Sequence, residues 1–329
     1  MAFSVMSRLW PALFLLLLAP AAVAEELEEQ VRRMVEAART MDYTGVLVHG
    51  MPVGVESMRL FHRGSADGSY RERLVMLTGP SRELVRDGRT VQRYHPEMGQ
   101  VVSGPRRSGT GVFKLVENDL ARVGDHYRLE AGPSGRVAGR EAEAVAFRAM
   151  DEERFSYRVW RDRETDLPLQ TEVIAADGTI MEVFMFAAVE PGNTPADADL
   201  ELQVPEGTPR VERKALTRET QAPDVLGAME LPAGFRLDAR FRGAGQGADG
   251  SHHLFYTDGL ASLSVFLEPT EASSADNQGE PEILQRGALH ACSVYRGGYR
   301  ITLLGELPGP AIRRIANSLD GTSGGEESP

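Results

Sequence analysis

Histidines and acidic residues are the side chains in this sequence that could bind a metal ion or transfer protons. Among seven histidines, only His252 and His253 are adjacent. Neighbouring side chains on a strand point to opposite faces, so this pair is not expected to chelate one ion. The charged runs 71–73 and 151–154 stand beside predicted turns, where such side chains are typically solvated. The sequence therefore predicts no metal site and no acid–base pair.

Nucleotide-binding motifs do not occur in a usable setting. A P-loop needs lysine directly after glycine, whereas Lys114 and Lys214 follow Phe113 and Arg213. Residues 245–250 match G-x-G-x-x-G, but a predicted strand follows, and only a helix could hold pyrophosphate there. No nucleophile–base pair can be named for a hydrolase. We expect a protein that is not an enzyme and carries no cofactor.

Cys292 is the single cysteine, so no disulfide can form within the chain. It lies in 288–294, which is predicted to be a strand, and a buried, unreactive thiol is expected. The formal net charge of −12 leaves no basic face for phosphate neutralisation. Nucleic acid is therefore excluded as a partner.

The N-terminus carries the pattern of a secretory signal peptide. Arg8 is followed by the apolar run Leu13–Leu18 and by the small-x-small cleavage site Ala22–Ala24. The run is shorter than the roughly 20 residues that a membrane span needs. We expect cleavage after residue 24, a mature protein that begins at Glu25, and export to the periplasm.

The elements that follow are mostly short strands joined by tight turns. An apolar stripe at helical spacing predicts one amphipathic helix over 26–41. Turn signals such as Asp87-Gly88 and Asp177-Gly178 separate segments that alternate or carry β-formers, which indicates an antiparallel sheet. The predicted strands are 43–49, 56–63, 69–77, 90–94, 143–149, 154–161, 169–175 and 179–189, with a brief helix at 113–120.

Two of these strands differ in their faces. Alternation in 154–161 predicts an ordinary half-buried strand, whereas 180–189 is apolar on both faces and is expected to be covered on both sides. The second pattern suits either a central strand in a thick core or a concave sheet that holds an apolar ligand. The residues alone favour the core. The candidates for a lipid pocket are Met58, Met76, Phe155, Tyr157, Phe184 and Phe186.

A proline-rich stretch from Glu190 to about Pro223 separates these strands from a second group, and one strand is expected near 200–204. The second group comprises strands 235–242, 251–257, 261–268, 288–295 and 299–304 and a helix after Pro310. The chain is therefore divided into a signal peptide (1–24), a first domain (25–205), a linker (206–223), a small second domain (224–319) and a disordered tail (320–329).

The most distinctive stretch of the sequence is Tyr256–Glu268. The other distinctive segments are Trp160–Leu169, 82–86, 94–96, 287–289, 304–308 and 315–316. Together, and in the same order, these segments resemble the MucB/RseB family of periplasmic regulators of sigma-E or AlgU type sigma factors, although the run Trp160–Leu169 also occurs in lipoprotein carriers. Cys292 departs from the pattern. Asp258-Gly259, within the most specific stretch, is expected to make a tight turn between two strands rather than to contact a partner.

The resemblance implies a mainly β fold with some α. Its first domain would be an unclosed antiparallel β-barrel with plugging helices, similar to the LolA/LolB carriers, and a smaller α+β domain would follow. It also implies binding to the periplasmic domain of a membrane anti-sigma factor of MucA or RseA type. The bound partner would be shielded from a protease and released when lipid or lipopolysaccharide binds.

This resemblance makes the concave-sheet interpretation the better one. A periplasmic lipid or lipoprotein carrier stays the alternative, although it leaves residues 224–319 without a purpose. A homodimer stays open, and no residue is assigned to the anti-sigma factor.

Overall fold

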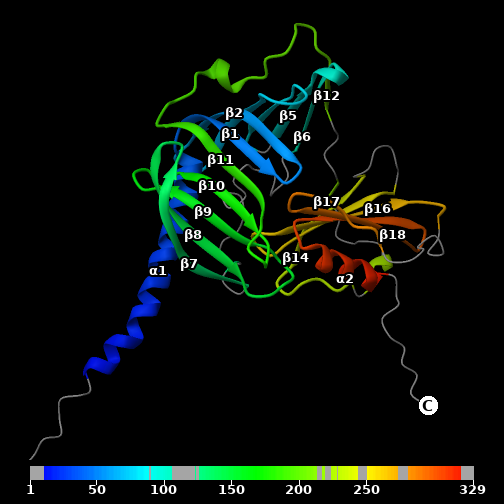
Figure 1. The fold of residues 1–329 in the computed structure, drawn as a ribbon. Helices are drawn as coiled ribbons and strands as arrows, with labels where there is room; N and C mark the ends of the chain where they lie inside the picture. The colour runs from blue at the N-terminus through cyan, green and yellow to red at the C-terminus, as the bar shows by residue number, and fades with distance from the viewer. Residues whose placement is uncertain are drawn as a thin grey trace, which may run out of the picture.

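The structure is a computed structural model that describes residues 11–88, 90–105, 123, 126–212, 217–218, 224–227, 229–243, 250–272 and 281–319. Its strands form one sheet of twelve strands and a second sheet of seven strands. Figure 1 shows the two sheets side by side, the first associated with α1 and the second with α2.

The first sheet is a single curled layer with strand order β12-β6-β5-β4-β3-β2-β1-β11-β10-β9-β8-β7. Within β1–β6 and within β7–β11, chain neighbours pair in antiparallel orientation, and the pairing of β1 with β11 joins these two halves. Among the described strands, β7 and β12 are edges, so the barrel is unclosed. The strands are β1 (Tyr43–Met51), β2 (Gly54–Gly64), β3 (Tyr70–Met76), β4 (Glu83–Asp87), β5 (Thr90–His95), β6 (Gln100–Pro105), β7 (Tyr127–Val137), β8 (Arg140–Ala149), β9 (Ser156–Asp162), β10 (Pro168–Ile174), β11 (Ile180–Pro191) and β12 (Arg210–Glu212).

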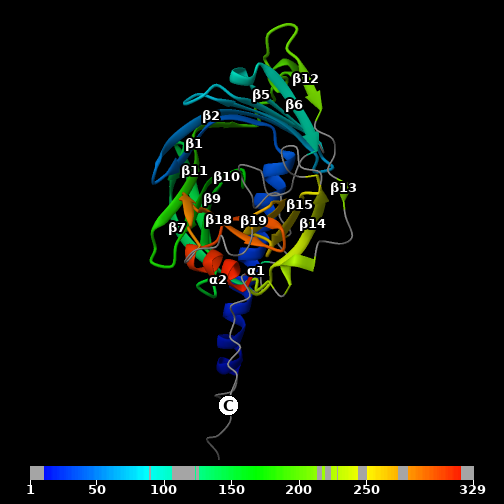
Figure 2. The ribbon, with the colours of Figure 1, turned by 90° about the vertical axis from the view of Figure 1, so that its right-hand side faces the viewer.

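Helix α1 (Pro11–Thr40) lies inside the curve of this sheet. It contacts β2, β7 and β10, which are far apart in the strand order, and only the concave side brings them within reach of one helix. Figure 2 shows the sheet arching over the helix. The buried residues Leu27, Val31 and Met34 form its apolar stripe. The first turns of α1 extend away from the body of the molecule (Figure 1).

The second sheet has the order β13-β14-β15-β16-β19-β18-β17 and carries α2 (Gly309–Leu319) on one face. Ile312, Ile315, Ala316 and Leu319 of α2 pack with Val265 and other residues of the sheet in one core. The strands are β13 (Thr217–Arg218), β14 (Arg236–Arg242), β15 (His252–Thr257), β16 (Ser262–Pro269), β17 (Leu284–Arg286), β18 (Leu289–Arg296) and β19 (Tyr299–Gly305). Short 3-10 helices lie at η1 (Pro96–Met98), η4 (Asp197–Leu200) and η5 (Asp224–Leu226).

The fold class predicted from the sequence is confirmed: mainly β, with an unclosed antiparallel sheet and a smaller α+β unit. The strand expected near 200–204 is wrong, because Asp197–Leu200 turns as a 3-10 helix that buries Leu200 against the sheet. Within the predicted linker, β12 pairs in parallel with β6. The brief helix expected at 113–120 lies outside the described residues.

Candidate functional site

Three of the six residues proposed for a lipid pocket form a row on the concave face of the first sheet. Leu47 on β1 pairs with Phe186 on β11 and with Met58 on β2. Met58 pairs in turn with Met76 on β3. All four pack in one apolar cluster with Ala38 of α1. Met58 and Phe186 are buried, and Met76 keeps part of its surface exposed.

Phe155 and Tyr157 belong to a second cluster, which contains Leu27 and Val31 of α1. Both aromatic side chains are buried. The Tyr157 hydroxyl has no hydrogen-bond partner among the described residues. Burial, followed by the charge of Asp258, raises the pKa of Tyr157, so the hydroxyl keeps its proton. The Tyr157 hydroxyl is therefore an unsatisfied polar group within this second apolar cluster.

Phe184 lies between the two clusters. Its ring stacks on His49 of β1 with centroids 3.8 Å apart, and His49 also pairs with Glu182. The side chain is part-exposed, and Ile180 on the same strand is 46% exposed. The expectation that this strand is covered on both sides is therefore wrong, since the sheet is one layer and α1 covers only its inner face.

The six residues thus lie on the side of the sheet that α1 covers, four as packed core and two part-exposed. Their placement does not by itself open a cavity.

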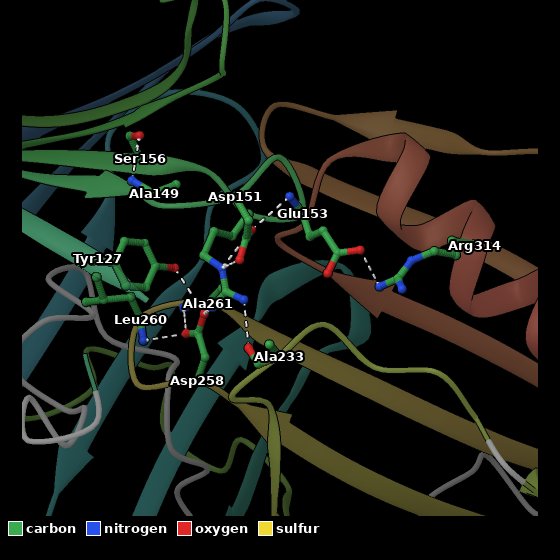
Figure 3. A network of polar contacts seen from close by, with 11 residues as sticks. Tyr127, Ala149, Asp151, Glu153, Ser156, Ala233, Asp258, Leu260, Ala261 and Arg314 are labelled. Carbon is green, nitrogen blue, oxygen red and sulfur yellow. Dashed lines mark hydrogen bonds and ion pairs between the residues drawn. The ribbon is translucent and has the colours of Figure 1, made fainter. Parts of the chain in front are cut away.

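The two domains meet at an ion pair that is fully buried (Figure 3). The guanidinium of Arg154, just before β9, pairs with the carboxylate of Asp258 in the second domain, and neither side chain is exposed. Arg154 Nη2 also donates to the carbonyl of Ala233 at 2.7 Å, and its Nε donates to Asp151 at 3.0 Å. The Tyr127 hydroxyl donates to Asp258 Oδ2 at 3.1 Å. Every member of the network except Asp151 is thereby tied to the other domain.

Asp258 also holds its own turn. Its Oδ1 accepts the backbone N–H groups of Leu260 and Ala261 at 2.9 and 2.8 Å. Burial lowers the pKa of Arg154, but hydrogen bonding to Asp151 and the charge of Asp258 raise it above its ordinary value. A buried pair is stable only when its remaining polar atoms are satisfied, and this one is. The network of Arg154, Asp258, Tyr127 and Ala233 is therefore a specific contact between the domains, the inter-domain joint.

An apolar contact and a surface ion pair surround the joint. Leu260 and Ala288 of the second domain pack in the same cluster as Tyr157, and the Phe155 ring lies over His290 with centroids 6.2 Å apart. Arg314 of α2 pairs with Glu153, and both are part-exposed, at 41% and 31%. Figure 3 shows this second pair beside the first.

Sequence reasoning expected Asp258-Gly259 only to make a tight turn. The turn is confirmed, but the inter-domain role of Asp258 was missed, and Arg154 was assigned to a solvated charged run. The one available signal was that Asp258 lies in the most distinctive stretch, Tyr256–Glu268. Neither segment carries a sequence signal that identifies the other as its partner, because Arg154 and Asp258 are 104 positions apart in the sequence.

A second buried charge cluster lies at the far end of the concave face. Glu72 on β3 pairs with Arg86 on β4 and with His62 on β2, and Tyr43 stacks on His62 at 4.4 Å. Burial opposes ionisation of Glu72, but Arg86 and His62 hold its pKa at about 2. The charges of Glu72 and Arg86 compensate each other within the sheet, so we assign this cluster a structural role.

Within the described residues, no group of three His, Cys, Asp or Glu side chains could hold a metal ion. None of the described helices is long and apolar enough to cross a membrane.

Models of one protein family match both parts of the chain. The family model described as the MucB/RseB N-terminal domain matches residues 26–204, and that of the MucB/RseB C-terminal domain matches 222–320. The sigma factor AlgU regulatory protein MucB of Pseudomonas aeruginosa is 29% identical over 316 residues, which is 92% of this chain and 94% of that protein. The sigma-E factor regulatory protein RseB of Escherichia coli K12 is 27% identical over 88% of this chain and 89% of its own.

Solved structures show the same relationship. The complex of Pseudomonas aeruginosa MucA and MucB matches with a TM-score of 0.68 and 26% identity, and covers 88% of this chain and 97% of that chain. A structure of MucB in complex with MucA(peri) matches with a TM-score of 0.65 and 26% identity over 88% of this chain and 96% of that chain.

Proposed function

This chain belongs to the MucB/RseB family, and from that premise we propose that it is a periplasmic regulator of an envelope-stress sigma factor. It binds the periplasmic part of a membrane anti-sigma factor and protects that partner from proteolysis. The observation that carries the proposal is the alignment over 88% of this chain with MucB solved in complex with MucA. Both domains are included, so the proposal does not depend on the carrier-like domain alone.

We also propose that lipid or lipopolysaccharide binds the concave face and releases the partner. The wall formed by Met58, Met76, Phe184 and Phe186 supplies apolar surface, and each methylene of an acyl chain buried there contributes about 0.8 kcal/mol. The unsatisfied Tyr157 hydroxyl, in the second apolar cluster on the same side of the sheet, adds a polar group for the ligand. Because α1 covers the buried part of this wall, lipid must displace part of the helix or enter beside it.

Release requires that lipid and partner favour different states of the protein. A ligand shifts an equilibrium only by its difference in affinity between two states, and the coupling between two ligands is reciprocal. The Arg154–Asp258 contact lies beside the second apolar cluster, in which Tyr157 packs with Leu260 of the second domain, and α1 contributes residues to both apolar clusters. Lipid that moves α1 therefore acts on the contact between the domains.

The test is a titration of the purified protein with the periplasmic fragment of an anti-sigma factor of MucA or RseA type from the same organism. Affinity is measured with and without lipopolysaccharide fragments, and lipid affinity is measured with and without the fragment. Both affinities should fall by the same factor. If the fragment binds equally well in both conditions, there is no switch. If lipid binds but the fragment never does, the protein is a periplasmic lipid or lipoprotein carrier.

A further inference from the structure

The connection between the domains crosses the outer face of the first sheet, opposite α1. Leu84 packs against the concave cluster, so Val85, the next residue of β4, points outward. Residues 201–210, which form a strap, run from η4 to β12 over this outer face. The Gln203 N–H donates to Glu83 Oε2 at 3.0 Å, and β12 pairs with β6. The strap is therefore held to the sheet near both of its ends.

A pocket of about 250 Å³ lies between the strap and the sheet. Its floor consists of outward-facing residues in two cross-strand rows on β3, β4 and β5. Arg71, Asp87 and Thr90 form one row, and Val85 and Gln92 form the next. The strap lines the opposite wall with Glu201, Leu202 and Arg210. Because paired strands fix the floor, the sheet sets the spacing of its polar groups.

The pocket presents hydrogen-bond donors and acceptors of both charges. Arg71 and Arg210 supply guanidinium donors, whereas Asp87 and Glu201 supply carboxylate acceptors. The hydroxyl and the amide of the floor each donate and accept. A ligand with one net charge would meet a like charge here, whereas a neutral ligand with many hydroxyl groups matches both kinds of partner.

The contacts within the pocket are weak enough to be replaced by a ligand. Arg71 Nε lies 3.4 Å from Asp87 Oδ2, and the two side chains are 34% and 60% exposed. Such an exposed pair contributes little to stability. Arg210 Nη1 donates to Gln92 Oε1 at 3.3 Å, which is longer than a usual hydrogen bond. A hydroxyl group inserted between either pair can therefore bond to both partners at small cost.

We propose that this pocket binds one ring of a neutral sugar. Each sugar hydroxyl donates and accepts, so one ring satisfies guanidinium and carboxylate groups together. Buried Val85 and part-buried Leu202 offer apolar surface to the C–H face of the ring. The volume equals that of about eight water molecules in the liquid, which suits a single ring with its hydroxyl groups. The site lies on the opposite face of the sheet from the proposed lipid wall and does not depend on that proposal.

A bound sugar connects the strap to the sheet. Arg210 is the first residue of β12, so a ring that bonds to its guanidinium and to the floor adds a contact across the β12–β6 pairing. The three residues of β12 are all exposed, so few other contacts support that pairing. We therefore expect the sugar to slow hydrogen exchange of the β12 backbone amides severalfold.

The experiment is calorimetric titration of the purified protein with glucose and N-acetylglucosamine, and with alanine and inorganic phosphate for comparison. We expect at least one of the sugars to bind at one site more tightly than alanine or phosphate. Hydrogen exchange followed by mass spectrometry measures the protection of β12. Flotation with phosphatidylcholine vesicles that contain a glucosyl diacylglycerol is done in parallel.

Two variants test the site without disturbing the core. Thr90→Ala with Gln92→Ala removes two neutral polar groups and keeps all the charges, and should weaken sugar binding at least about tenfold. Arg210→Gln should weaken binding and also remove the sugar-dependent protection of β12. Arg128→Gln is the matched control, since Arg128 lies on β7 in an exposed pair with Glu130 and should not change affinity.

Unchanged affinity in the double variant, or no binding of either sugar or of the glycolipid vesicles to the wild-type protein, overturns the site. Tighter binding of alanine or phosphate overturns the ligand class in favour of a zwitterion or an anion. Sugar binding that leaves the exchange of β12 unchanged overturns the contact with the strap.

The vesicles distinguish the two sources of the sugar. Vesicle binding that is lost in the double variant identifies a glycolipid head group, whereas binding of free sugar alone identifies a soluble saccharide. Vesicle binding that persists in the double variant, without binding of free sugar, overturns the site.

Discussion

At the scale of single residues, the contrast between two ion pairs that cross the same boundary is the most informative feature. Arg154 and Asp258 are fully buried, whereas Arg314 and Glu153 are part-exposed. Removing one partner of a buried pair leaves an uncompensated charge, while an exposed pair is screened by solvent. The two pairs should therefore differ strongly in their contributions to stability.

We expect Asp258→Asn to lower the free energy of unfolding by about 3–5 kcal/mol, because Arg154 would lose its buried counter-charge. Glu153→Gln, the matched control at the same boundary, should cost less than about 1 kcal/mol. Urea unfolding followed by circular dichroism measures both. Arg154→Met combined with Asp258→Asn should cost less than Asp258→Asn alone, and similar costs for Asp258→Asn and Glu153→Gln would contradict the assignment.

Glu72 gives a prediction for acid stability. Its pKa is about 2 in the folded protein and 4.5 in its ordinary state, so ionised Glu72 stabilises the fold fully above about pH 5. This contribution is lost as the pH falls from 4.5 towards 2, and it amounts to about 3 kcal/mol. Unfolding of Glu72→Gln and wild type across pH 2–7 should show a difference that shrinks in this window. A difference that is independent of pH would mean that Glu72 is not ionised in the fold.

The candidates for lipid contact are not equivalent as sites for mutation. Phe186 is fully buried against Gly45, where even a Cβ would meet its ring at 2.8 Å. Phe186→Asp should therefore unfold the domain rather than report on lipid. Phe184→Asp, at a part-exposed position, should remove the lipid response of partner binding while the protein still unfolds cooperatively. Ile180→Asp, on the same strand, is the control, and loss of the response in both variants would argue against a specific wall.

At the scale of elements, α1 carries the regulation we propose, and strand β12 holds the connection between the domains against the first sheet. Helix α1 is the one described helix on the concave face, so its stripe of Leu27, Val31 and Met34 competes with any lipid for that surface. The connection after Pro205 is pinned by β12, whose pairing with β6 is extended by the Val101 N–H bond to the Pro209 carbonyl at 2.8 Å.

Limited proteolysis tests the domain division. The predicted linker 206–223 contains Arg210, Arg213, Lys214 and Arg218, which trypsin recognises. We expect first cleavage within this segment, at sites other than the paired strand β12, and two resistant fragments. Mass spectrometry of the early products identifies the sites. Early cleavage scattered through 43–189 would show that the two domains are not separate units.

At the scale of the whole molecule, the predicted signal peptide and the joint between the domains decide which surfaces are available. Residues 11–24 continue α1 away from the body, so their removal leaves the buried stripe that begins at Leu27 intact. We expect the mature protein to begin at Glu25 and to fractionate with the periplasm. Edman sequencing of the purified protein measures this, and retention of residues 1–24 in a membrane fraction would contradict it.

The sequence by itself determined most of the elements and the family, although β4, β6 and β7 were not among the predicted strands. Alternation in 154–161, the helical stripes at 26–41 and after Pro310, and the turn at Asp258-Gly259 are local patterns that backbone geometry imposes on neighbouring residues. They predicted the mainly β fold. Met58, Met76 and Phe186, which were proposed as lipid contacts, lie in one apolar cluster of that fold.

Only the tertiary structure decided how the elements meet. The partner of Asp258 is 104 residues away in sequence, so no local period could identify Arg154, and its charged neighbours suggested a solvated loop. The exposure of Ile180 depends on the first sheet being one layer deep, with α1 on its inner face only. Burial and long-range pairing are properties of the packed chain, which is why a pattern of residue types predicted the strands but not the joint between the domains.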